Sequence, residues 1–328
     1  MTISVYIGSS PPAGSKRTLL QMIGDACSEL GLVAPTTVFS NSDQQIIQLL
    51  ALAQREGMET YSMGTSIGGW QELRQEYAFN VQSTGLVPVN IVAGSTTIEF
   101  VTAPATAPQV GWVISNSAGS NATGFLYPTT VTAIIDATHV TVSNASTITA
   151  SATNLAIGKD TYDFPADIDH TIPQTFWDRS FRWQILGPLD PQEWQVLKSG
   201  ISPTGPRRRF RIFDGKFVID PVPYDNNRLV YEYYSTYWCQ SQAGAGQMRW
   251  MADDDVYNLN DQTFILGLIW RFRRAKGLDY AQEKETWQNA IDRYKARMAS
   301  ARSLPLNATA SGIRLLNSNN VPDTGYGS

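Results

Sequence analysis

The sequence has few of the residues that build metal centres or disulfide frameworks, and it has few charges. Its 328 residues include two cysteines, Cys27 and Cys239, and two histidines, His139 and His170. This small supply predicts no disulfide framework and no zinc site of the four-cysteine or the two-cysteine, two-histidine type. Charged residues make up 16% of the chain, which is low for a soluble protein. The net charge of −4 argues against a basic protein that grips nucleic-acid phosphates.

Long apolar runs are also absent. The longest, Phe264 to Trp270, is interrupted by Gly267 and is too short to span a bilayer. The first seven residues contain neither a basic segment nor a long apolar one, so we expect no signal peptide. The 9 Trp, 14 Tyr and 12 Phe exclude a disordered chain. We expect a soluble protein of about two domains, made in a reducing cytoplasm and without a membrane partner.

The composition changes between residues 86 and 158. This stretch is rich in Thr, Ser, Val, Ala and Ile, and its only charged residues are Glu99 and Asp136. Short β-prone runs recur in it, each bounded by Gly, Pro, Asn or Asp. The runs cover residues 96–101, 111–115, 130–135 and 139–143. Because such spacing is typical of a small antiparallel barrel or sandwich, we predict an inserted β domain over residues 85–158.

The segments on either side of this insert, residues 1–84 and 159–303, are predicted to form one discontinuous core. Apolar side chains recur at helical spacing over residues 17–30, and Gly31 follows as a cap. A second helix is predicted to begin at Ser42, because Ser-Asp-Gln-Gln fits a capping box, and to end near Gly57.

Beyond the insert, the sequence predicts a short helix and a β-meander. Asp190, Pro191 and Glu193 fit the cap, the first position and the third position of a helix. The dipeptide Asp214-Gly215 lies between two β-prone runs, which predicts a tight hairpin. A third strand over residues 228–238 would complete the meander.

The C-terminal third predicts a long antiparallel helical hairpin. One helix is expected from the aspartates at 253–255 to Lys276, with acids at its start and bases at its end. The other is expected to open at Asp279 and to carry an apolar seam at heptad-like spacing. Apolar side chains occupy too many faces of this hairpin for a monomer, so six of them are predicted to contact neighbouring subunits. These are Phe264, Leu268, Trp270, Trp287, Ile291 and Tyr294.

Three motifs have the residue types of a chemical site, and each has a simpler structural interpretation. The sequence Gly64-Thr65-Ser66-Ile67-Gly68 matches a nucleophile elbow, but a polar helix end precedes it instead of an apolar strand. Residues 8–16 have the wrong spacing for a phosphate loop. The aspartates at 253–255 would diverge on a helix, which favours capping over a cation site. We therefore predict no catalytic residue, no cofactor and no metal.

The densest basic cluster consists of Arg207, Arg208, Arg209 and Arg211. On a strand, Arg209 and Arg211 share one face. Two interpretations stay open for this cluster: a solvated sheet edge protected from unwanted pairing, or a contact with an acidic partner or with DNA phosphates in a channel.

The last residues, 304–328, are rich in Asn, Ser and Gly. They contain one small apolar island, Ile313, Arg314, Leu315 and Leu316. This composition predicts a flexible tail that orders when a partner holds it.

The order of these parts resembles that of the head-to-tail adaptor proteins of tailed bacteriophages, also called head-completion or connector proteins. The resemblance rests on the N-terminal helical pair with Ser42-Asp43-Gln44-Gln45-Ile46 and on the strand Tyr162-Asp163-Phe164-Pro165-Ala166-Asp167. The Asp214-Gly215 hairpin, the tyrosine-rich strand after it and the closing helical hairpin complete the likeness. It covers about residues 1–84 and 159–303.

The resemblance implies an α+β fold with a helical adaptor core, a β-meander and a long C-terminal helical hairpin, to which this chain adds an all-β barrel or sandwich. Residues 124–134 and 138–143 make that insert similar to small β-barrels common in phage virion proteins. Many simpler adaptors lack such an insert.

For function, the family implies a structural virion protein and not an enzyme. Its members form a ring, typically of twelve copies, below the portal, and the genome passes through the centre during packaging and ejection. The implied partners are identical subunits, the portal, tail nozzle or tail tube proteins, and DNA in transit. The implied location is the head-tail junction of the virion, after synthesis in a bacterial cytoplasm. The island at residues 313–316 would then contact the portal.

A competing hypothesis is a tail-associated glycan-binding or lytic protein that uses the inserted β domain. Trp112 or Tyr127 would stack on a sugar, and Ser66 or a pair of carboxylates would cut it. The near absence of charge in the insert argues against hydrolysis there.

Overall fold

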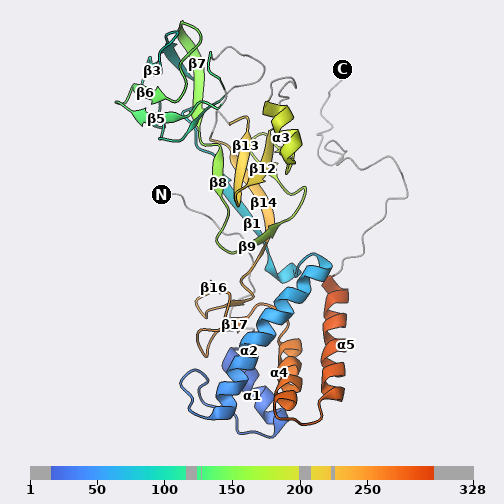
Figure 1. Cartoon of the computed structure of the whole chain (residues 1–328). Helices are drawn as coiled ribbons and strands as arrows, with labels where there is room; N and C mark the ends of the chain where they lie inside the picture. Colours follow the sequence, from blue (N-terminus) through green and yellow to red (C-terminus); the bar gives the residue numbers. More distant parts are fainter. Residues whose placement is uncertain (1–15, 116–123, 127, 199–207, 223–225, 299–328) are drawn as a thin grey trace, which may run out of the picture.

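The computed structural model describes residues 16–115, 124–126, 128–198, 208–222 and 226–298. The chain has a mixed α+β fold, which confirms the predicted class at that level. Figure 1 shows a helical bundle at one end, β-sheets in the middle and a barrel-like sheet at the far end.

Helices from both ends of the chain form the bundle. They are α1 (Leu19–Leu30), α2 (Gln44–Met63), α4 (Asp261–Ala275) and α5 (Ala281–Met298). Helix α4 lies at the centre, since it contacts each of the other three. Its residues Phe264 and Leu268 have no exposed surface. The apolar character of α4 on several faces therefore follows from burial by helices of the same chain.

Two predicted ends of α2 are wrong by a few residues. The helix is capped by Asp43, whose carboxylate accepts a hydrogen bond from the Gln45 amide (2.8 Å), and not by Ser42. It continues past Gly57 to Met63. Gly57 has a packing role instead, because a Cβ atom there would lie 2.3 Å from the ring of Trp238. The predicted end of α1 is confirmed, since Gly31 adopts a left-handed cap with φ of 70°.

The predicted start of the next helix is also wrong. Helix α4 begins at Asp261 with Asn260 as its cap, and the aspartates at 253–255 precede it in a loop. The Asp253 carboxylate accepts hydrogen bonds from the Val38 and Phe39 amides, both 3.0 Å long. Side chains that bond to backbone amides in this way compete with helix formation.

Two β-sheets pack against each other in the middle of the molecule. The larger has strand order β1-β14-β10-β11, with β9 also paired to β14, and the smaller has order β12-β13-β8. The strands are β1 (Arg74–Asn80), β8 (Thr161–Asp163), β9 (Ile168–Thr171), β10 (Trp177–Asp178), β11 (Trp183–Gln184), β12 (Arg209–Phe213), β13 (Lys216–Asp220) and β14 (Arg228–Ser235). Phe176, Phe210, Phe217 and Tyr231 form the centre of their shared aromatic core.

The predicted hairpin is confirmed, but the predicted meander is wrong. Asp214 and Gly215 both have positive φ, 50° and 65°, and Phe213 pairs with Lys216 across the turn. The strand beside β13 is β8, whereas β14 belongs to the other sheet. Strand β14 is a central strand, paired with β1 on one edge and with β9 and β10 on the other, so it does not end a meander.

The barrel-like sheet has six strands in the order β4-β7-β2-β3-β6-β5. They are β2 (Val87–Ile91), β3 (Thr97–Phe100), β4 (Val113–Ser115), β5 (Val131–Ile134), β6 (His139–Val142) and β7 (Ala150–Gly158). A bridge between Val113 and Thr130 brings the two edges together and nearly closes the sheet. The sequence predicts β3 to β6, but it misses β2 and β7.

Shorter elements join these parts. Helix α3 (Pro191–Lys198) lies beside the middle sheets, and its predicted capping box is confirmed by reciprocal bonds between Asp190 and Glu193 of 2.7 and 3.2 Å. A small sheet of β16 (Gly246–Gln247), β15 (Cys239–Gln240) and β17 (Val256–Tyr257) lies near the bundle, as Figure 1 shows. Two 3-10 helices, η2 (Gly64–Ile67) and η3 (Gln71–Leu73), connect α2 to β1.

Candidate functional site

The six side chains predicted to contact neighbouring subunits lie inside this chain. None is more than 5% exposed. Tyr294 stacks on Trp70 with ring centres 4.5 Å apart, and Trp270 packs on Trp287 at 5.4 Å. The sequence pattern shows that α4 and α5 are apolar on several faces, but it does not show that other elements of the same chain cover those faces. Phe264, Leu268, Trp270, Trp287, Ile291 and Tyr294 are therefore core residues, and they form no subunit surface in this structure.

A charged cluster is buried among these core residues. Arg271 Nε donates to Glu56 Oε2 (2.5 Å), and Arg271 Nη2 donates to Glu59 Oε2 (2.7 Å). Trp287 Nε1 donates to the second oxygen of Glu56 (2.9 Å), and the Thr60 hydroxyl donates to the same atom (3.1 Å). Glu56 has no exposed surface and Arg271 is 4% exposed. Burial raises the pKa of Glu56, and Arg271 opposes that shift. The cluster ties α2, α4 and α5 together, and Glu59, whose side chain is 36% exposed, lies at its edge.

The predicted arginine cluster is divided by the structure. Arg208 is buried, and its Nη1 donates to Asp178 Oδ2 (2.5 Å), which also accepts from Asn227 Nδ2 (2.9 Å). Arg209 and Arg211 share the face of β12 that is covered by α3, where Arg211 lies 4.5 Å above the ring of Trp194. Arg207 lies outside the described residues. Arg208 is therefore a structural ion-pair partner, and Arg209 and Arg211 remain candidates for contact with a partner.

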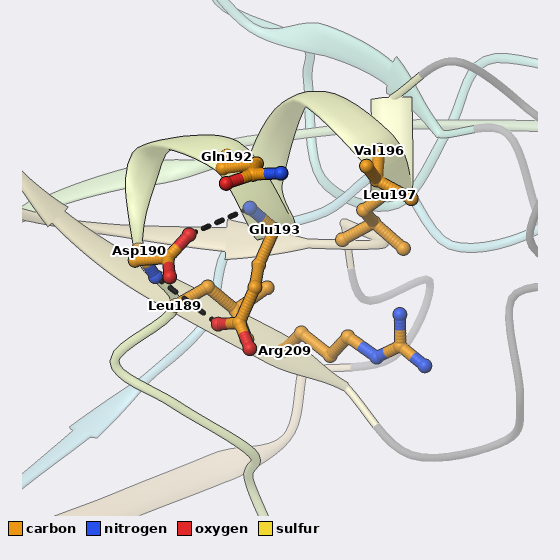
Figure 2. Close-up of a pocket in the computed structure, with 7 residues that line it drawn as sticks. All are labelled: Leu189, Asp190, Gln192, Glu193, Val196, Leu197 and Arg209. Carbon is orange, nitrogen blue, oxygen red and sulfur yellow. Dashed lines mark hydrogen bonds between the residues drawn. The ribbon is translucent and has the colours of Figure 1, made fainter.

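A pocket of about 390 Å³ opens between α3 and β12, as shown in Figure 2. Its lining residues are Leu189, Asp190, Gln192, Glu193, Val196, Leu197 and Arg209. The capping bonds between Asp190 and Glu193 hold one wall rigid, and the guanidinium of Arg209 extends along the opposite wall. Apolar, acidic and basic side chains therefore meet at one opening.

Exposed apolar side chains extend the surface around this pocket. Val196 on α3 is 52% exposed, and Phe213 at the end of β12 is 59% exposed. Phe213 lies under the guanidinium of Arg211, 4.4 Å from it. We call this region the α3–β12 surface, and its members are the pocket residues together with Arg211 and Phe213. The sequence predicts its arginines, but it misses Val196 and Phe213. The sequence offers a signal for Phe213 alone, the Arg-x-Arg-x-Phe strand directly before the Asp-Gly turn.

A second charged pair lies beside this surface. The Lys198 ammonium at the end of α3 donates to the Asp220 carboxylate at the end of β13. Each side chain is 13% exposed. Asp160 lies within electrostatic reach of both groups, and burial raises its pKa.

The structure does not support a nucleophile at Ser66. The residue lies in η2, directly after a helix, and its hydroxyl donates to the Met63 carbonyl (2.9 Å). His170 forms a pair with Asp169 (2.7 Å) and packs on Tyr234. Neither histidine is hydrogen-bonded to Ser66 among the described residues.

Of the two aromatic residues that the glycan hypothesis places on the barrel surface, the structure describes Trp112. Trp112 is 3% exposed and belongs to the barrel core. Tyr127 lies outside the described residues. His139 is bound to Asp136 by Nδ1 at 3.0 Å from each carboxylate oxygen, on the edge of an exposed turn.

Within the described ranges, no group of three or more His, Cys, Asp or Glu side chains is arranged to hold a metal ion. Asp255, one of the three aspartates considered for a cation, is buried and accepts from the Met251 and Ala252 amides at 2.6 and 2.9 Å. Cys27 and Cys239 are both free thiols in the interior. Among the helices that the structure describes, none has the length and apolar character needed to cross a membrane.

The remaining predicted site lies outside the described residues. It comprises Ile313, Arg314, Leu315 and Leu316, together with the rest of the 304–328 tail. No protein-family model matches the chain, and no curated protein has a significantly similar sequence.

Proposed function

We propose that this protein is a structural head-to-tail adaptor of a tailed bacteriophage, one that forms a ring joining the portal to the tail and lining the DNA channel. The order of parts quoted above supports this, and the α3–β12 surface carries it. That surface combines the exposed aromatic ring of Phe213 with Arg209 and Arg211, and aromatic residues and arginine are enriched at protein interfaces.

The occupant we propose for the α3–β12 surface is the next copy of the chain around the ring. Asp190 and Glu193 stand beside Arg209, so the surface carries both signs of charge. Acidic groups at the opening repel DNA phosphates, which disfavours DNA as the occupant. A neighbouring subunit that offers a different patch to this surface generates a closed ring when the contact repeats around an axis.

The exposed side of α5 carries charges of both signs, which suits the wall of a DNA channel. Three basic residues and two acidic residues are exposed on this helix, namely Lys284, Arg293 and Arg297 with Glu285 and Asp292. Each phosphate that a protein neutralises strengthens its hold on DNA, so a wall of mixed charge lets DNA slide. We assign the wall of the channel to this face, and we assign portal binding to the island at residues 313–316.

The test is to measure assembly of the full-length chain, alone and with portal-bearing capsids, by analytical ultracentrifugation and negative-stain electron microscopy. We expect a closed ring, either in solution or on the portal. A chain that stays monomeric and does not bind capsids would overturn the proposal.

Two variants locate the contacts. Phe213→Glu places a charge in the α3–β12 surface and should prevent ring closure. Its matched control is Leu278→Glu, which adds the same charge at a side chain 55% exposed in the turn between α4 and α5. Removal of residues 304–328 should abolish joining to capsids while leaving the fold intact. If Phe213→Glu forms rings as well as the wild type does, the subunit contact is not at the α3–β12 surface, but the proposed function still stands.

A further inference from the structure

Lys198 and Asp220 form an ion pair in a mostly apolar setting. The pair joins the last residue of α3 to the last residue of β13. Trp194, Leu197 and Val218 form a buried cluster from the same two elements. The Lys198 nitrogen lies 5.0 Å from the centre of the Trp194 ring. With side chains only 13% exposed, both groups have lost most of their water.

A third titratable group, Asp160, is close enough to Lys198 and Asp220 to interact electrostatically with both. It directly precedes β8, which pairs with β13, and its carbonyl accepts from the Ile219 amide (2.9 Å). The Thr161 hydroxyl donates to its carboxylate (2.9 Å). Burial raises the pKa of Asp160, and the charge of Asp220 adds to that effect against the opposing charge of Lys198.

The environment also favours the neutral form of the lysine. Burial lowers the pKa of Lys198, the charge of Asp220 opposes this, and the nearby Arg211 guanidinium adds to the lowering. Little water remains here to stabilise the two ions, so the neutral amine and the neutral carboxylic acid are favoured. A neutral amine is a nucleophile, and the carbon of a carboxylic acid is an electrophile.

We propose that Lys198 and Asp220 join through an intramolecular isopeptide bond, with Asp160 as the proton carrier. A proton first passes from the Lys198 ammonium to the Asp220 carboxylate, which leaves a neutral amine beside a neutral carboxylic acid. The amine nitrogen then attacks Cγ of Asp220. Asp160 takes a proton from that nitrogen and returns it to the departing hydroxyl, so that a C–O bond breaks and one water leaves. The condensation requires no oxidant, reductant or co-reactant.

Two physical effects favour the condensation here. The fold holds the amine and the carboxyl group in contact, which removes the entropy cost of bringing them together. The apolar surroundings weaken the hydration that stabilises the ion pair against reaction. The bond would link α3 covalently to β13 and close a loop of chain from Lys198 to Asp220. This loop contains β12, the strand that carries Arg209, Arg211 and Phe213. It would therefore hold the α3–β12 surface in shape, whatever that surface binds.

The test is the mass of the intact, denatured full-length protein. We expect the wild-type chain to be lighter than its sequence by one water molecule, and tandem mass spectrometry to find a branched peptide joining Lys198 to Asp220. Lys198→Arg retains the ion pair but is expected to have its full sequence mass. Asp160→Asn removes the proton carrier, so we expect most or all of this variant to have its full sequence mass.

A control is needed because Asp214-Gly215 can also lose water by forming a succinimide. The Lys198→Arg variant retains that dipeptide, so loss of water in this variant as well as in the wild type would overturn the proposal. A wild-type chain at its full sequence mass would overturn it too, and this result does not depend on any variant folding. If Asp160→Asn loses as much water as the wild type, the proposed role of Asp160 is wrong, but the proposed bond between Lys198 and Asp220 still stands.

Discussion

Two glycines in the helical bundle make room for large or charged side chains from distant parts of the sequence. A Cβ atom at Gly57 would meet the ring of Trp238, and one at Gly267 would lie 2.1 Å from Glu56 Oε1. In the sequence, Gly57 resembles a helix end and Gly267 resembles an interruption of an apolar run. Their packing roles depend on contacts between residues far apart in the chain, which local patterns do not contain.

Replacing Gly267 by alanine should destabilise the protein by about 1–3 kcal/mol, because the added methyl group overlaps the buried Glu56 carboxylate. Gly24→Ala is the matched control. It makes the same substitution inside α1, where the new Cβ would meet only Ala34 at 4.0 Å. We expect the control to be neutral or stabilising by up to about 1 kcal/mol. Chemical denaturation measures both, and equal effects would refute the overlap argument.

Asp136 gives the barrel a pH-dependent contribution to stability. The Thr138 amide donates to its carboxylate (2.7 Å), and His139 adds a second bond, so that the pKa of Asp136 is lowered from 3.8 to about 2. The folded protein binds this proton more weakly than the unfolded chain. Its stabilising effect is therefore complete above pH 3.8 and is lost as the pH falls towards 2. An NMR titration of the carboxyl carbon should show this midpoint, and Asp136→Asn should lose that part of the pH dependence.

At the scale of elements, the sequence predicts those whose ends are set by neighbouring residues. The capping box of α3 and the Asp214-Gly215 hairpin are both local, and both are confirmed. The start of α4 is predicted too early, because the Asp253 carboxylate accepts a hydrogen bond from the Val38 amide instead of capping a helix. The partners of β14 are misplaced because β1 lies far away in the sequence. Strand pairing of that kind depends on which faces are covered, and this is decided by the whole fold.

The Glu56–Arg271 cluster clamps three helices together, and it can be tested by removing one partner at a time. Arg271→Met should destabilise the protein by about 3–5 kcal/mol, because it leaves the Glu56 carboxylate buried without its counterion. The double variant Glu56→Leu/Arg271→Met should recover most of this loss. Denaturant unfolding measures each variant.

Arg274→Met is the control for this series, since it removes an exposed arginine from the same helix. It should change stability by less than about 0.5 kcal/mol. A single variant Arg271→Met as stable as this control would show that the cluster contributes little to the packing of α2, α4 and α5.

For the whole molecule, the sequence identifies which helices are apolar but not what covers them. The pattern of α4 and α5 is the same whether the cover is a second subunit or a second pair of helices. In the structure, α1 and α2 cover α4, whereas α4 and η2 contact α5. These apolar side chains are therefore not available to a partner, and the subunit contact that we propose lies at α3 and β12 instead. Val196 and Phe213 are isolated apolar residues in short elements, and periodicity cannot mark them as exposed.

The geometry of the barrel's two connections predicts that the rest of the molecule folds without it. The chain enters and leaves beside the bridge between Ser83 and Gly158, and the Lys159 amide donates to the Gln82 carbonyl (2.9 Å). The apolar core of the barrel is separate from those of the bundle and of the middle sheets. A deletion of the barrel should retain Gly158, because this glycine packs against Val222 of the middle region.

Deleting residues 86–157 and closing the gap with a short Gly-Ser linker should therefore leave cooperative unfolding and the circular dichroism of the helices intact. On the proposed function, the shortened chain should also assemble as the full chain does in analytical ultracentrifugation. An aggregated or non-cooperative product would show that the core requires the barrel to fold. A folded product that no longer assembles would instead place a subunit contact on the barrel.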